Sequence, residues 1–473
     1  MEKKETNYGY LLFLAIIAAL GGFLFGYDTA VISGTIPLVV GQYGLDTMSQ
    51  GWYVGCALVG SIIGVLCAGI LSDGIGRKWS MLLSAILFTT SAVGCAVCHS
   101  FDQLVVYRII GGMGIGVVSI VSPLYISEIS IPKYRGRMVA LYQLAVTIGF
   151  LGAYLINFAL LRWSSSDPSL SGDWMQLIFS TEVWRGMLGM ETIPALLFLV
   201  AILFIPESPR WLILRHKDDR AREILRTMHR DPEVVESQMS ETRAAIAATS
   251  AEQSSLRLLR EPAVLRPVLI GVAIAMLGQF MGVNAVLYYG PSIFEGAGLA
   301  AQDSLWYQVW IGIVNVLTTV LAIFLIDKVG RKTLVYYGVS GMIMSLVLIG
   351  LYFLYGEAIG ISSTWLLVFF LAYIFFCAGS ISAVIFVFLS EMYPTRIRGL
   401  AMSLAGLSLW IGTYLIGQLT PWMLETLTPS GTFFLFALMC LPYLYIVWRL
   451  MPETTGKSLE EIERFWFRST PSR

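Results

Sequence analysis

Residues 52–72 read WYVGCALVGSIIGVLCAGILS, an uncharged apolar run that the charged hexapeptide DGIGRK follows at residues 73–78. A run of this length crosses a hydrocarbon core of about 30 Å as one helix, and the basic residues after it mark the cytoplasmic side. The same arrangement recurs later, where the apolar residues 305–326 precede DKVGRK at 327–332. This repeat predicts a membrane protein built from two similar halves.

The composition of the whole chain agrees with a lipid-embedded protein. Of its 473 residues, 56% are hydrophobic and 13% are charged, and the mean hydropathy is +0.73. Soluble domains carry about 25% charged residues. The net charge of zero does not favour a nucleic-acid partner. The six cysteines lie in apolar runs, so we expect them to pack between helices, and we predict neither a metal site nor a cofactor.

The hydropathy pattern predicts an all-α membrane protein with twelve transmembrane helices. Lys and Arg gather after the second, fourth, eighth and tenth of these helices, whereas the loops after helices 1, 3, 7, 9 and 11 contain almost none. The positive-inside rule then places both termini in the cytoplasm. The expected helices span residues 10–35, 52–72, 80–98, 104–127, 138–161, 186–205, 268–292, 305–326, 333–355, 365–389, 400–422 and 431–451.

The repeat divides the chain into two pseudo-symmetric six-helix bundles. The N-terminal bundle covers residues 1–206 and the C-terminal bundle residues 268–451, with a cytoplasmic tail at 452–473. Between the bundles, the polar segment 207–267 is expected to be a cytoplasmic linker with short amphipathic helices near 220–228 and 237–248. In such parallel repeats, a site near the membrane midplane opens to each face in turn.

Four further motifs carry a family resemblance. They are GYDTAVISG at residues 26–34, RIIGG at 108–112, PESPRWL at 206–212 and PETTGK at 452–457. Together with the loops DGIGRK at 73–78 and DKVGRK at 327–332, these motifs make the chain resemble the sugar porters of the major facilitator superfamily along essentially its whole length. Within that family it is most similar to bacterial proton-coupled pentose and hexose symporters, such as those for xylose. The resemblance implies the major facilitator fold and transport of a monosaccharide with a proton.

Ionisable residues inside predicted helices need an explanation, because each costs about 2.5–3.5 kcal/mol at bilayer depth. Asp28, Arg108 and Glu191 all fall in the outer halves of their helices and can therefore meet. The resemblance identifies Asp28 and Arg108 as the coupling pair of the symporters and Glu191 as an assisting residue. We expect Asp28 to carry the proton. A static ion pair that only satisfies two buried charges is the alternative.

A sugar site needs amides for the hydroxyl groups and aromatic rings for the apolar ring face. The resemblance assigns these roles to Gln143, Gln279, Asn284, Asn315, Tyr288, Phe25, Phe386 and Trp410. Three positions lack the usual polar or aromatic residue of the family, namely Gly278, Phe386 and Leu409. The cavity is therefore expected to be less polar than a typical xylose or glucose site, and the sugar itself stays open, with a xylose-like pentose or hexose as the first expectation.

Acidic and basic residues also alternate at the predicted cytoplasmic helix ends of both halves. We expect them to form a latch of salt bridges that closes the inner face; charges that only set topology are the alternative. Gly74 replaces the family's usual basic residue after Asp73, which predicts a latch in the first half that is weaker or altered but still present. The latch residues are Asp73, Arg77, Glu128, Arg135, Asp327, Arg331, Glu391 and Arg398.

Other functions fit the sequence less well. A passive sugar uniporter is the main alternative, and the carboxylate of Asp28 argues against it. A membrane sugar sensor ranks lower because the tail after the last helix is short, and no nucleophile–base pair favours an enzyme. Short tails and loops suggest a bacterial inner-membrane protein, with the lipid bilayer, a monosaccharide and the proton as its partners. We expect a monomer.

Overall fold

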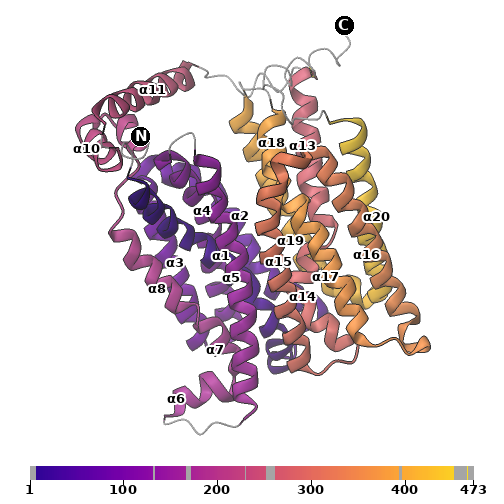
Figure 1. Ribbon diagram of the computed structural model, residues 1–473. Helices are drawn as coiled ribbons and strands as arrows, with labels where there is room; N and C mark the ends of the chain where they lie inside the picture. Colours follow the sequence, from indigo (N-terminus) through magenta and orange to yellow (C-terminus); the bar gives the residue numbers. More distant parts are fainter. Residues whose placement is uncertain are drawn as a thin grey trace. The chain divides into compact units, whose positions relative to one another are not determined.

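The computed structural model of the chain describes residues 7–130, 134–166, 172–229, 231–251, 262–393, 397–451 and 466. In this part of the chain, twelve helices are long and apolar enough to cross a membrane (Figure 1). The predicted fold class and the count of twelve spans are therefore confirmed. The predicted division into two bundles at 207–267 and the predicted tail at 452–473 lie partly outside the described residues and stay predictions.

The helices before the linker follow the predicted spans but extend several residues further at most ends. They are α1 (Tyr8–Tyr43), α2 (Thr47–Ile75), α3 (Arg77–Val97), α4 (Phe101–Ile129), α5 (Arg135–Ser164), α6 (Asp173–Gln176), the π-helical turn η1 (Leu177–Thr181), α7 (Val183–Gly189) and α8 (Thr192–Leu203).

The helices after the linker behave in the same way. They are α13 (Pro262–Phe280), α14 (Val283–Gly296), α15 (Ala301–Val329), α16 (Arg331–Ile359), α17 (Ser363–Gly379), α18 (Ile381–Met392), α19 (Arg398–Thr426) and α20 (Thr428–Arg449).

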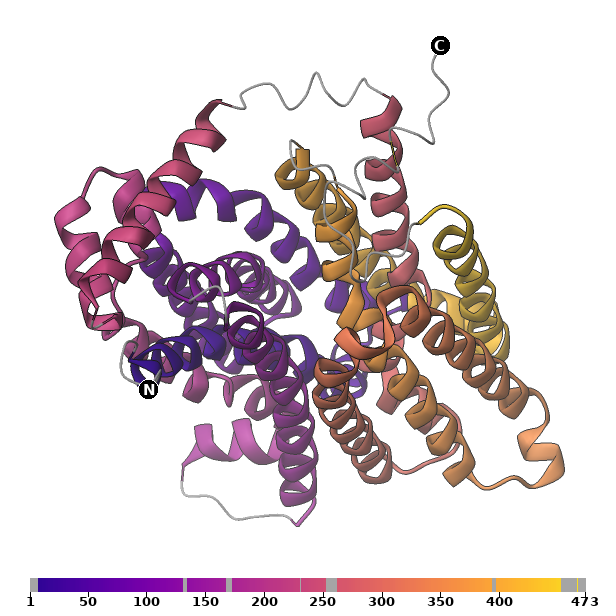
Figure 2. The ribbon, with the colours of Figure 1, turned by 45° about the horizontal axis from the view of Figure 1, so that its top comes forward.

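The linker contains the expected amphipathic helices, preceded by a short one: α9 (Pro209–Leu214), α10 (Asp218–Met228) and α11 (Pro232–Ala251). Leu225 of α10 is buried, while Arg222 donates from Nε to Glu236 of α11 at 2.7 Å. The backbone N–H of Asn7 bonds to the carbonyl of Met228 at 2.9 Å. The end of α10 therefore lies against the start of α1, near the N-terminus in both ribbon views (Figures 1 and 2).

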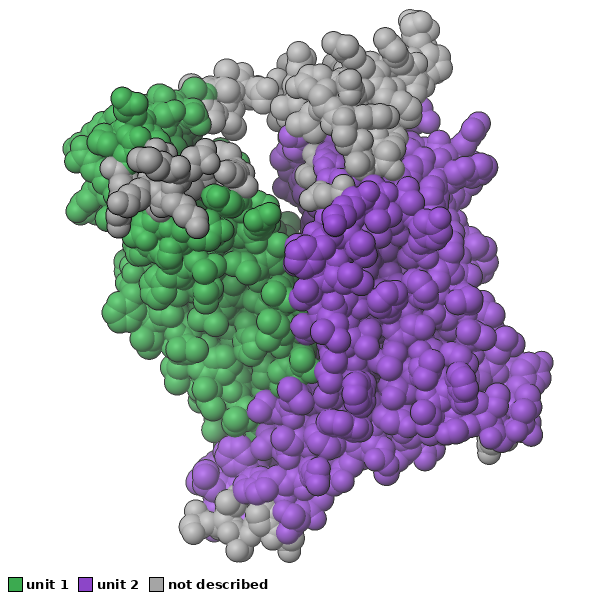
Figure 3. All heavy atoms as spheres, in the orientation of Figure 1, with its two compact units in different colours: residues 1–29, 59–153, 185–253 green, residues 30–58, 154–184, 254–473 purple. Residues whose placement is uncertain are grey.

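Backbone contacts divide the chain into two compact units, coloured in Figure 3. The first unit comprises residues 1–29, 59–153 and 185–253, and the second comprises 30–58, 154–184 and 254–473. The second unit therefore contains the predicted outer ends of α1, α2 and α5 together with the C-terminal helices. Each unit has its own buried core and its own share of the candidate site residues.

Three spans predicted as single helices are broken in the structure. The span 186–205 is interrupted between α7 and α8, 268–292 between α13 and α14, and 365–389 at Ser380 between α17 and α18. Pro194 explains the first break because it has no N–H for the carbonyl four residues earlier. Gly282 explains the second, since its φ of 87° is a left-handed conformation that favours glycine.

Pro291 frees a further carbonyl inside α14, that of Leu287 four residues before it. Two side chains of the second unit donate to this oxygen: the hydroxyl of Tyr154 at 3.0 Å and Nε2 of Gln308 at 3.2 Å. Both side chains are buried. Since lipid offers no hydrogen bonds to a free carbonyl, the kink in α14 depends on these donors from α5 and α15.

The start of α2 and the end of α19 interlock in the same unit. Nε2 of Gln418 donates to the carbonyl of Met48 at 3.0 Å, and the hydroxyl of Thr47 donates to the carboxylate of Glu425. Gly51 permits this approach, because a Cβ there would lie 2.1 Å from the carbonyl oxygen of Gln418. The segment 30–58 is thereby held to the C-terminal helices by close backbone packing as well as by hydrogen bonds.

The shared carbonyl of Leu287 predicts non-additive losses of stability. Tyr154→Phe and Gln308→Met should each cost about 0.6 kcal/mol, because the other donor still bonds to the oxygen. The double variant leaves a buried carbonyl without a donor, and its cost should exceed the sum by about 1 kcal/mol or more. Thermal midpoints of the purified protein in one detergent measure these losses.

Tyr53→Phe is the matched control, because its hydroxyl contacts the hydroxyl of Thr35 at 2.8 Å and shares no acceptor with Gln308. Combined with Gln308→Met, it should give a simple sum. Additive losses in the Tyr154 and Gln308 pair would contradict the shared-carbonyl account.

Candidate functional site

A buried ion pair links α1 and α4 in the first unit. Asp28 is 1% exposed and Arg108 is 2% exposed. Nη1 of Arg108 donates to Oδ1 of Asp28, and the backbone carbonyl of Asp28 lies 3.4 Å from both Nη atoms. Oδ2 of Asp28 accepts no hydrogen bond from any described residue. The carboxylate is thus held by one cation while its second oxygen remains available for a proton.

Glu191 completes a cluster of three buried charges. It is 2% exposed and interacts electrostatically with both Asp28 and Arg108. Its position follows from the break between α7 and α8, where the N–H of Glu191 bonds to Leu188 at 3.3 Å instead of continuing the helix. The structure therefore brings together the three charges that the sequence placed at one depth.

Tyr27 ties the ion pair to this break. The hydroxyl of Tyr27 lies 3.4 Å from the carbonyl of Met187, the oxygen to which the N–H of Glu191 would donate in a regular helix. Tyr27 directly precedes Asp28 in α1. Its contact with Met187 therefore links Asp28 to the break between α7 and α8 in the sixth membrane span.

Two predicted sugar-site amides meet in the second unit. Nδ2 of Asn284 donates to Oε1 of Gln279 at 2.6 Å, and the hydroxyl of Thr413 in α19 approaches the same oxygen at 3.1 Å. Residues five apart in a regular α-helix point about 140° away from each other. The break at Gly282 turns the chain between Gln279 and Asn284 and makes their contact possible.

A buried tyrosine supports this break. The hydroxyl of Tyr373 in α17 donates to the carbonyl of Met281 at 2.7 Å. Phe436 lies beside Gly282, where a Cβ would come within 2.3 Å of its ring. Two aromatic residues, Tyr373 and Phe436, thus contact the kinked segment.

The remaining predicted sugar-site residues are divided between the two units. Gln143 and Phe25 are half-buried in the first unit, and Asn315 is half-buried in the second. Tyr288 and Trp410 are buried, whereas Phe386 is 51% exposed. A Cβ at Gly278 would make only ordinary contacts, 3.8 Å from Tyr443 and 3.9 Å from Ile381. A Cβ at position 278 would therefore fit without a clash.

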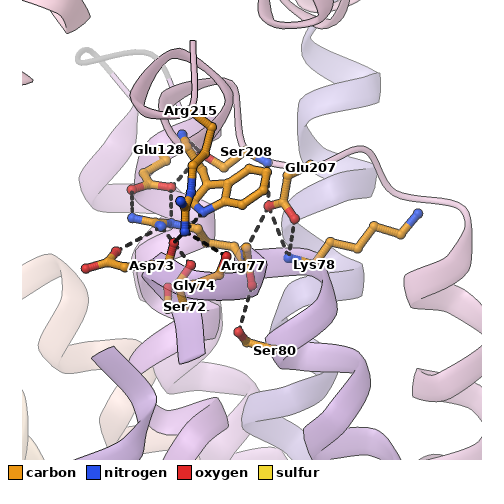
Figure 4. Close-up of polar contacts among 12 residues, drawn as sticks. Ser72, Asp73, Gly74, Arg77, Lys78, Ser80, Glu128, Glu207, Ser208 and Arg215 are labelled. Atoms are coloured by element: carbon orange, nitrogen blue, oxygen red, sulfur yellow. Dashed lines mark hydrogen bonds and ion pairs between the residues drawn. The ribbon is translucent and has the colours of Figure 1, made fainter. Parts of the chain in front are cut away.

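The predicted latch of the first half forms a buried network around Arg77 (Figure 4). Arg77 donates to both carboxylate oxygens of Glu128, from Nε at 2.9 Å and from Nη2 at 3.0 Å. Nη1 of Arg77 also donates to Asp73 at 3.1 Å. Arg135, expected beside Glu128, instead donates to the backbone carbonyl of Ser127 at 3.2 Å from an exposed position. Arg77 forms the ion pair with Glu128 because its side chain extends from the start of α3 toward the end of α4.

The end of α2 is capped by side chains of the linker. Nη2 of Arg215 donates to the carbonyls of Asp73 at 2.8 Å and Gly74 at 2.9 Å, and Nε1 of Trp211 donates to Asp73 at 3.0 Å. Cations near a helix C-terminus interact favourably with its dipole. Gly74 itself adds no side chain, so linker residues supply the basic group at this helix end.

Glu207 caps the start of α3, a role that the motif alone did not reveal. Its carboxylate accepts the backbone N–H groups of Arg77 at 2.8 Å, Lys78 at 3.2 Å and Ser208 at 2.8 Å. Gly76 precedes α3 with a φ of 102°, and a Cβ there would lie 2.2 Å from Oε2 of Glu207. An anion at a helix N-terminus satisfies free N–H groups and opposes the dipole.

The second half contains the corresponding residues Arg331, Glu391 and Arg398. Nη2 of Arg331 lies 3.4 Å from Oε1 of Glu391, and Nη2 of Arg398 lies 3.4 Å from the carbonyl of Tyr393. Nζ of Lys332 donates to the carbonyl of Met451 at 3.0 Å. The side chain of Asp327 and the motif at 452–457 lie outside the described residues.

Comparison with known proteins identifies the family. The family described as "Sugar (and other) transporter" matches residues 14–466. This chain belongs to that family of sugar porters in the major facilitator superfamily. The predicted resemblance is therefore confirmed.

Relatives of this sugar porter cover nearly its whole length. It is 34% identical to the arabinose-proton symporter of Bacillus subtilis over 466 residues, covering 98% of this chain and 97% of that one. It is 36% identical to the glucose transporter GlcP of Staphylococcus epidermidis over 456 residues, covering 96% of each. It is 34% identical to the D-xylose-proton symporter of Escherichia coli, covering 98% of this chain and 97% of that one.

Solved structures give the same result for the fold of the porter. The xylose transporter XylE from E. coli in an inward-open conformation matches with a TM-score of 0.81 at 32% identity, covering 97% of this chain and 100% of that one. XylE bound to 6-bromo-6-deoxy-D-glucose matches with a TM-score of 0.78 at 33% identity, with the same coverage.

The sequence missed two residues of the porter's candidate site. Glu207 lies in the recognised PESPRWL motif. Its position shortly before the Pro-initiated helix α9 could have suggested a cap for α9, but nothing in the sequence indicates that it caps α3. Thr413 follows Trp410 by almost one helical turn, and only the contact with Gln279 distinguishes it from other helix threonines.

The cap at α3 predicts that only one of two neighbouring glycines is sensitive to substitution by alanine. Gly76→Ala should destabilise the protein by about 1–3 kcal/mol, because the new Cβ meets Glu207 and the φ is unfavourable for alanine. Gly74→Ala is the control, since it lies in a helix with nothing within 4 Å of a Cβ. Thermal midpoints should fall for Gly76→Ala alone; equal midpoints would contradict the cap.

The carboxyl of Glu207 also predicts a pH dependence. Burial raises its pKa above the ordinary glutamate range, although the N–H groups of Ser208, Lys78 and Arg77 oppose the rise. The folded state therefore holds the proton more tightly than the unfolded state, and this contribution to stability is lost as pH rises through the raised pKa.

Glu207→Gln, which carries no charge at any pH, should show no such loss. The midpoint of the wild type relative to this variant should fall as pH rises from below the ordinary glutamate pKa to neutrality. A difference that stays constant, or that grows in the other direction, would refute the assignment.

Proposed function

We propose that this sugar porter imports a monosaccharide together with a proton by alternating access. The observation that carries the proposal is the buried ion pair of Asp28 and Arg108, whose second carboxylate oxygen accepts no hydrogen bond from the described residues. A charged pair in a membrane helix bundle marks an ion pathway or proton relay by default. The matched relatives include symporters named for arabinose and xylose.

Asp28 is the proposed proton carrier in this mechanism. Protonation of Asp28 removes the negative charge that holds Arg108. The positive charge of Arg108 is then balanced by the neighbouring Glu191. Release of the proton restores the pair with Arg108. Because the carboxyl is tied through Tyr27 to the break beside Glu191, a change at Asp28 acts directly on the sixth span.

The energetics suffice for accumulation. One proton moving down about 100 mV supplies about 2.3 kcal/mol. A gradient of one pH unit adds about 1.4 kcal/mol. The sum of about 3.7 kcal/mol supports an accumulation of roughly several-hundred-fold for a neutral sugar at one-to-one coupling.

The proposed substrate is a xylose-like pentose or a hexose. The amides of Gln143, Gln279, Asn284 and Asn315 are the proposed donors and acceptors for sugar hydroxyls. Phe25, Tyr288, Phe386 and Trp410 supply the apolar surface. Gly278 and Leu409 offer no hydrogen bonds, which favours a sugar with fewer hydroxyl contacts or a weaker affinity.

The networks around Arg77 and Arg331 are the proposed latch of the cytoplasmic face. The bidentate contact between Arg77 and Glu128 is well desolvated, whereas the contact of Arg331 with Glu391 is longer and more exposed. We place the protein in a bacterial inner membrane with both termini in the cytoplasm.

Sugar uptake into liposomes that contain the purified protein tests the proposal directly. With an inward proton gradient, the wild type should accumulate one sugar of a panel of xylose, arabinose, glucose and galactose above equilibrium. Asp28→Asn should lose this accumulation and still equilibrate the sugar, because the amide resembles the protonated carboxyl in shape but carries no exchangeable charge.

Asp102→Asn is the control, since Asp102 is an exposed aspartate in the first turn of α4, and it should accumulate sugar like the wild type. Accumulation by Asp28→Asn would remove its role as proton carrier. A wild type that never exceeds equilibrium would make the protein a uniporter with a static ion pair.

A further inference from the structure

A glycine of the RIIGG motif, almost one turn after Arg108 in α4, brings two buried oxygens of the first unit together. A Cβ at Gly111 would lie 2.5 Å from Oγ of Ser91 in α3 and 3.2 Å from Oδ2 of Asp28 in α1. The two oxygens are therefore within 5.7 Å of each other, the sum of these distances. Because glycine has no side chain, both oxygens can face the same point of α4.

Neither oxygen has a hydrogen-bond partner among the described residues. Oδ2 of Asp28 accepts no hydrogen bond, although Oδ1 accepts from Arg108. Earlier in α3, the hydroxyls of Ser80 and Ser84 donate to carbonyls four residues before them, at 2.7 Å and 3.1 Å. The hydroxyl of Ser91 makes no such bond within the described part of the chain, although Ser91 is only 2% exposed. Buried polar groups normally have a partner, so this pair of oxygens needs a shared one.

The face of α3 that carries Ser91 is directed toward the charge cluster. Cys95 follows Ser91 by four residues, so the two side chains lie on one side of the helix. Cys95 is buried as well. It interacts electrostatically with the three charged residues of the cluster, Asp28, Arg108 and Glu191. In the described chain, the titratable groups that face Asp28 from neighbouring elements are thus Arg108, Glu191 and Cys95.

One water molecule matches the separation of the two oxygens. Hydrogen bonds between oxygens are about 2.8 Å long, so one water joins oxygens that lie up to about 5.6 Å apart. The upper limit for Ser91 and Asp28 is 5.7 Å. Buried waters in proteins bind at such places, where they satisfy polar groups that have no other partner.

We propose that Ser91 and Gly111 form a water site at the second oxygen of Asp28, through which this carboxylate gains and loses its proton. A proton that arrives on the water as hydronium passes to Oδ2 and leaves a neutral water bound to Ser91; release is the reverse step. Ser91 is then a positioning residue that acts through the water. This inference rests on the proposed function, in which Asp28 carries the proton.

The direction of the effect of Ser91 follows from charge. The water that Ser91 holds donates to the ionised carboxylate and accepts from the protonated one. A hydrogen bond to an ionised acceptor is about twice as strong as one between neutral groups, so the site favours the ionised form of Asp28. Loss of the site should therefore let Asp28 take up its proton at a higher pH.

Infrared spectroscopy of the purified full-length protein in lipid measures this protonation directly. The C=O stretch of a protonated carboxyl group titrates with pH, and the part of the band that Asp28→Asn removes belongs to Asp28. In Ser91→Ala, the midpoint of this band should rise by about one pH unit, a tenfold change in proton affinity. The pH of half-maximal sugar accumulation in liposomes should move in the same direction.

Gly111→Ala is a second test, because its Cβ fills the shared space while Ser91 keeps its hydroxyl. It should also raise the midpoint, and the double variant with Ser91→Ala should not raise it further, since both changes remove the same water. Ser84→Ala is the matched control. Ser84 is buried in α3 like Ser91, but its hydroxyl bonds to the carbonyl of Ser80 at 3.1 Å. It should leave the midpoint unchanged.

The outcomes separate this inference from the function on which it rests. If the band of Asp28 titrates in the wild type but Ser91→Ala leaves its midpoint unchanged or lowers it, the water site is overturned while Asp28 remains the proton carrier. An equal rise in Ser84→Ala would overturn it too, since the effect is then one of helix packing. If the band of Asp28 titrates at no pH at which the protein stays folded, the proposed proton carrier fails, and the inference with it.

Discussion

In a membrane, each backbone carbonyl and N–H group needs a partner from the protein itself, because the lipid core provides none. A long apolar helix meets this requirement without help, but a broken helix does not. Each break in this structure is accompanied by a side chain that donates to the carbonyl left over. Tyr27 approaches Met187, Tyr373 donates to Met281, and Ser380 donates to Phe376 at 2.6 Å. Buried hydroxyl groups thus decide where the helices of this protein can bend.

The candidate sites lie at these bends. The break between α7 and α8 positions Glu191 beside the ion pair of Asp28 and Arg108. The break between α13 and α14 brings Gln279 to Asn284. In both cases, the bend provides polar side chains with contacts that a straight helix would not allow. The residue that supports a bend is also a neighbour of the site, so that stability and the candidate function depend on the same hydrogen bonds.

The ends of the helices follow a different physical rule. Here the helix dipoles are exposed, and charges of the opposite sign neutralise them. Arg215 covers the end of α2 and Glu207 covers the start of α3, while Arg77 lies between them and pairs with Glu128. Arg77 and Glu207 belong to the recognised motifs, whereas Glu128 and Arg215 lie outside them. The network therefore joins motif residues to charged residues that the motifs do not include.

The sequence by itself determined the parts of this protein that depend on the solvent and on local composition. Apolar length fixed the twelve spans, charge placement predicted their orientation, and the repeated loops at Asp73 and Asp327 predicted two related halves. The family motifs also led to Asp28, Arg108 and Glu191, since ionisable residues are conspicuous in apolar helices. These features are readable because lipid imposes the same requirement on every segment, whatever its neighbours.

Only the tertiary structure decided which groups share a hydrogen bond. Pro194 and Gly282 indicated possible breaks, but neither shows which tyrosine supports a freed carbonyl. Glu128 pairs with Arg77 instead of the nearby Arg135, and Thr413 reaches Gln279 because Gly412 lets two helices approach. These contacts join residues that are 51 and 134 positions apart in the chain. Hydrogen bonds act over about 3 Å, so their partners are set by the packing of helices and not by any pattern within one segment.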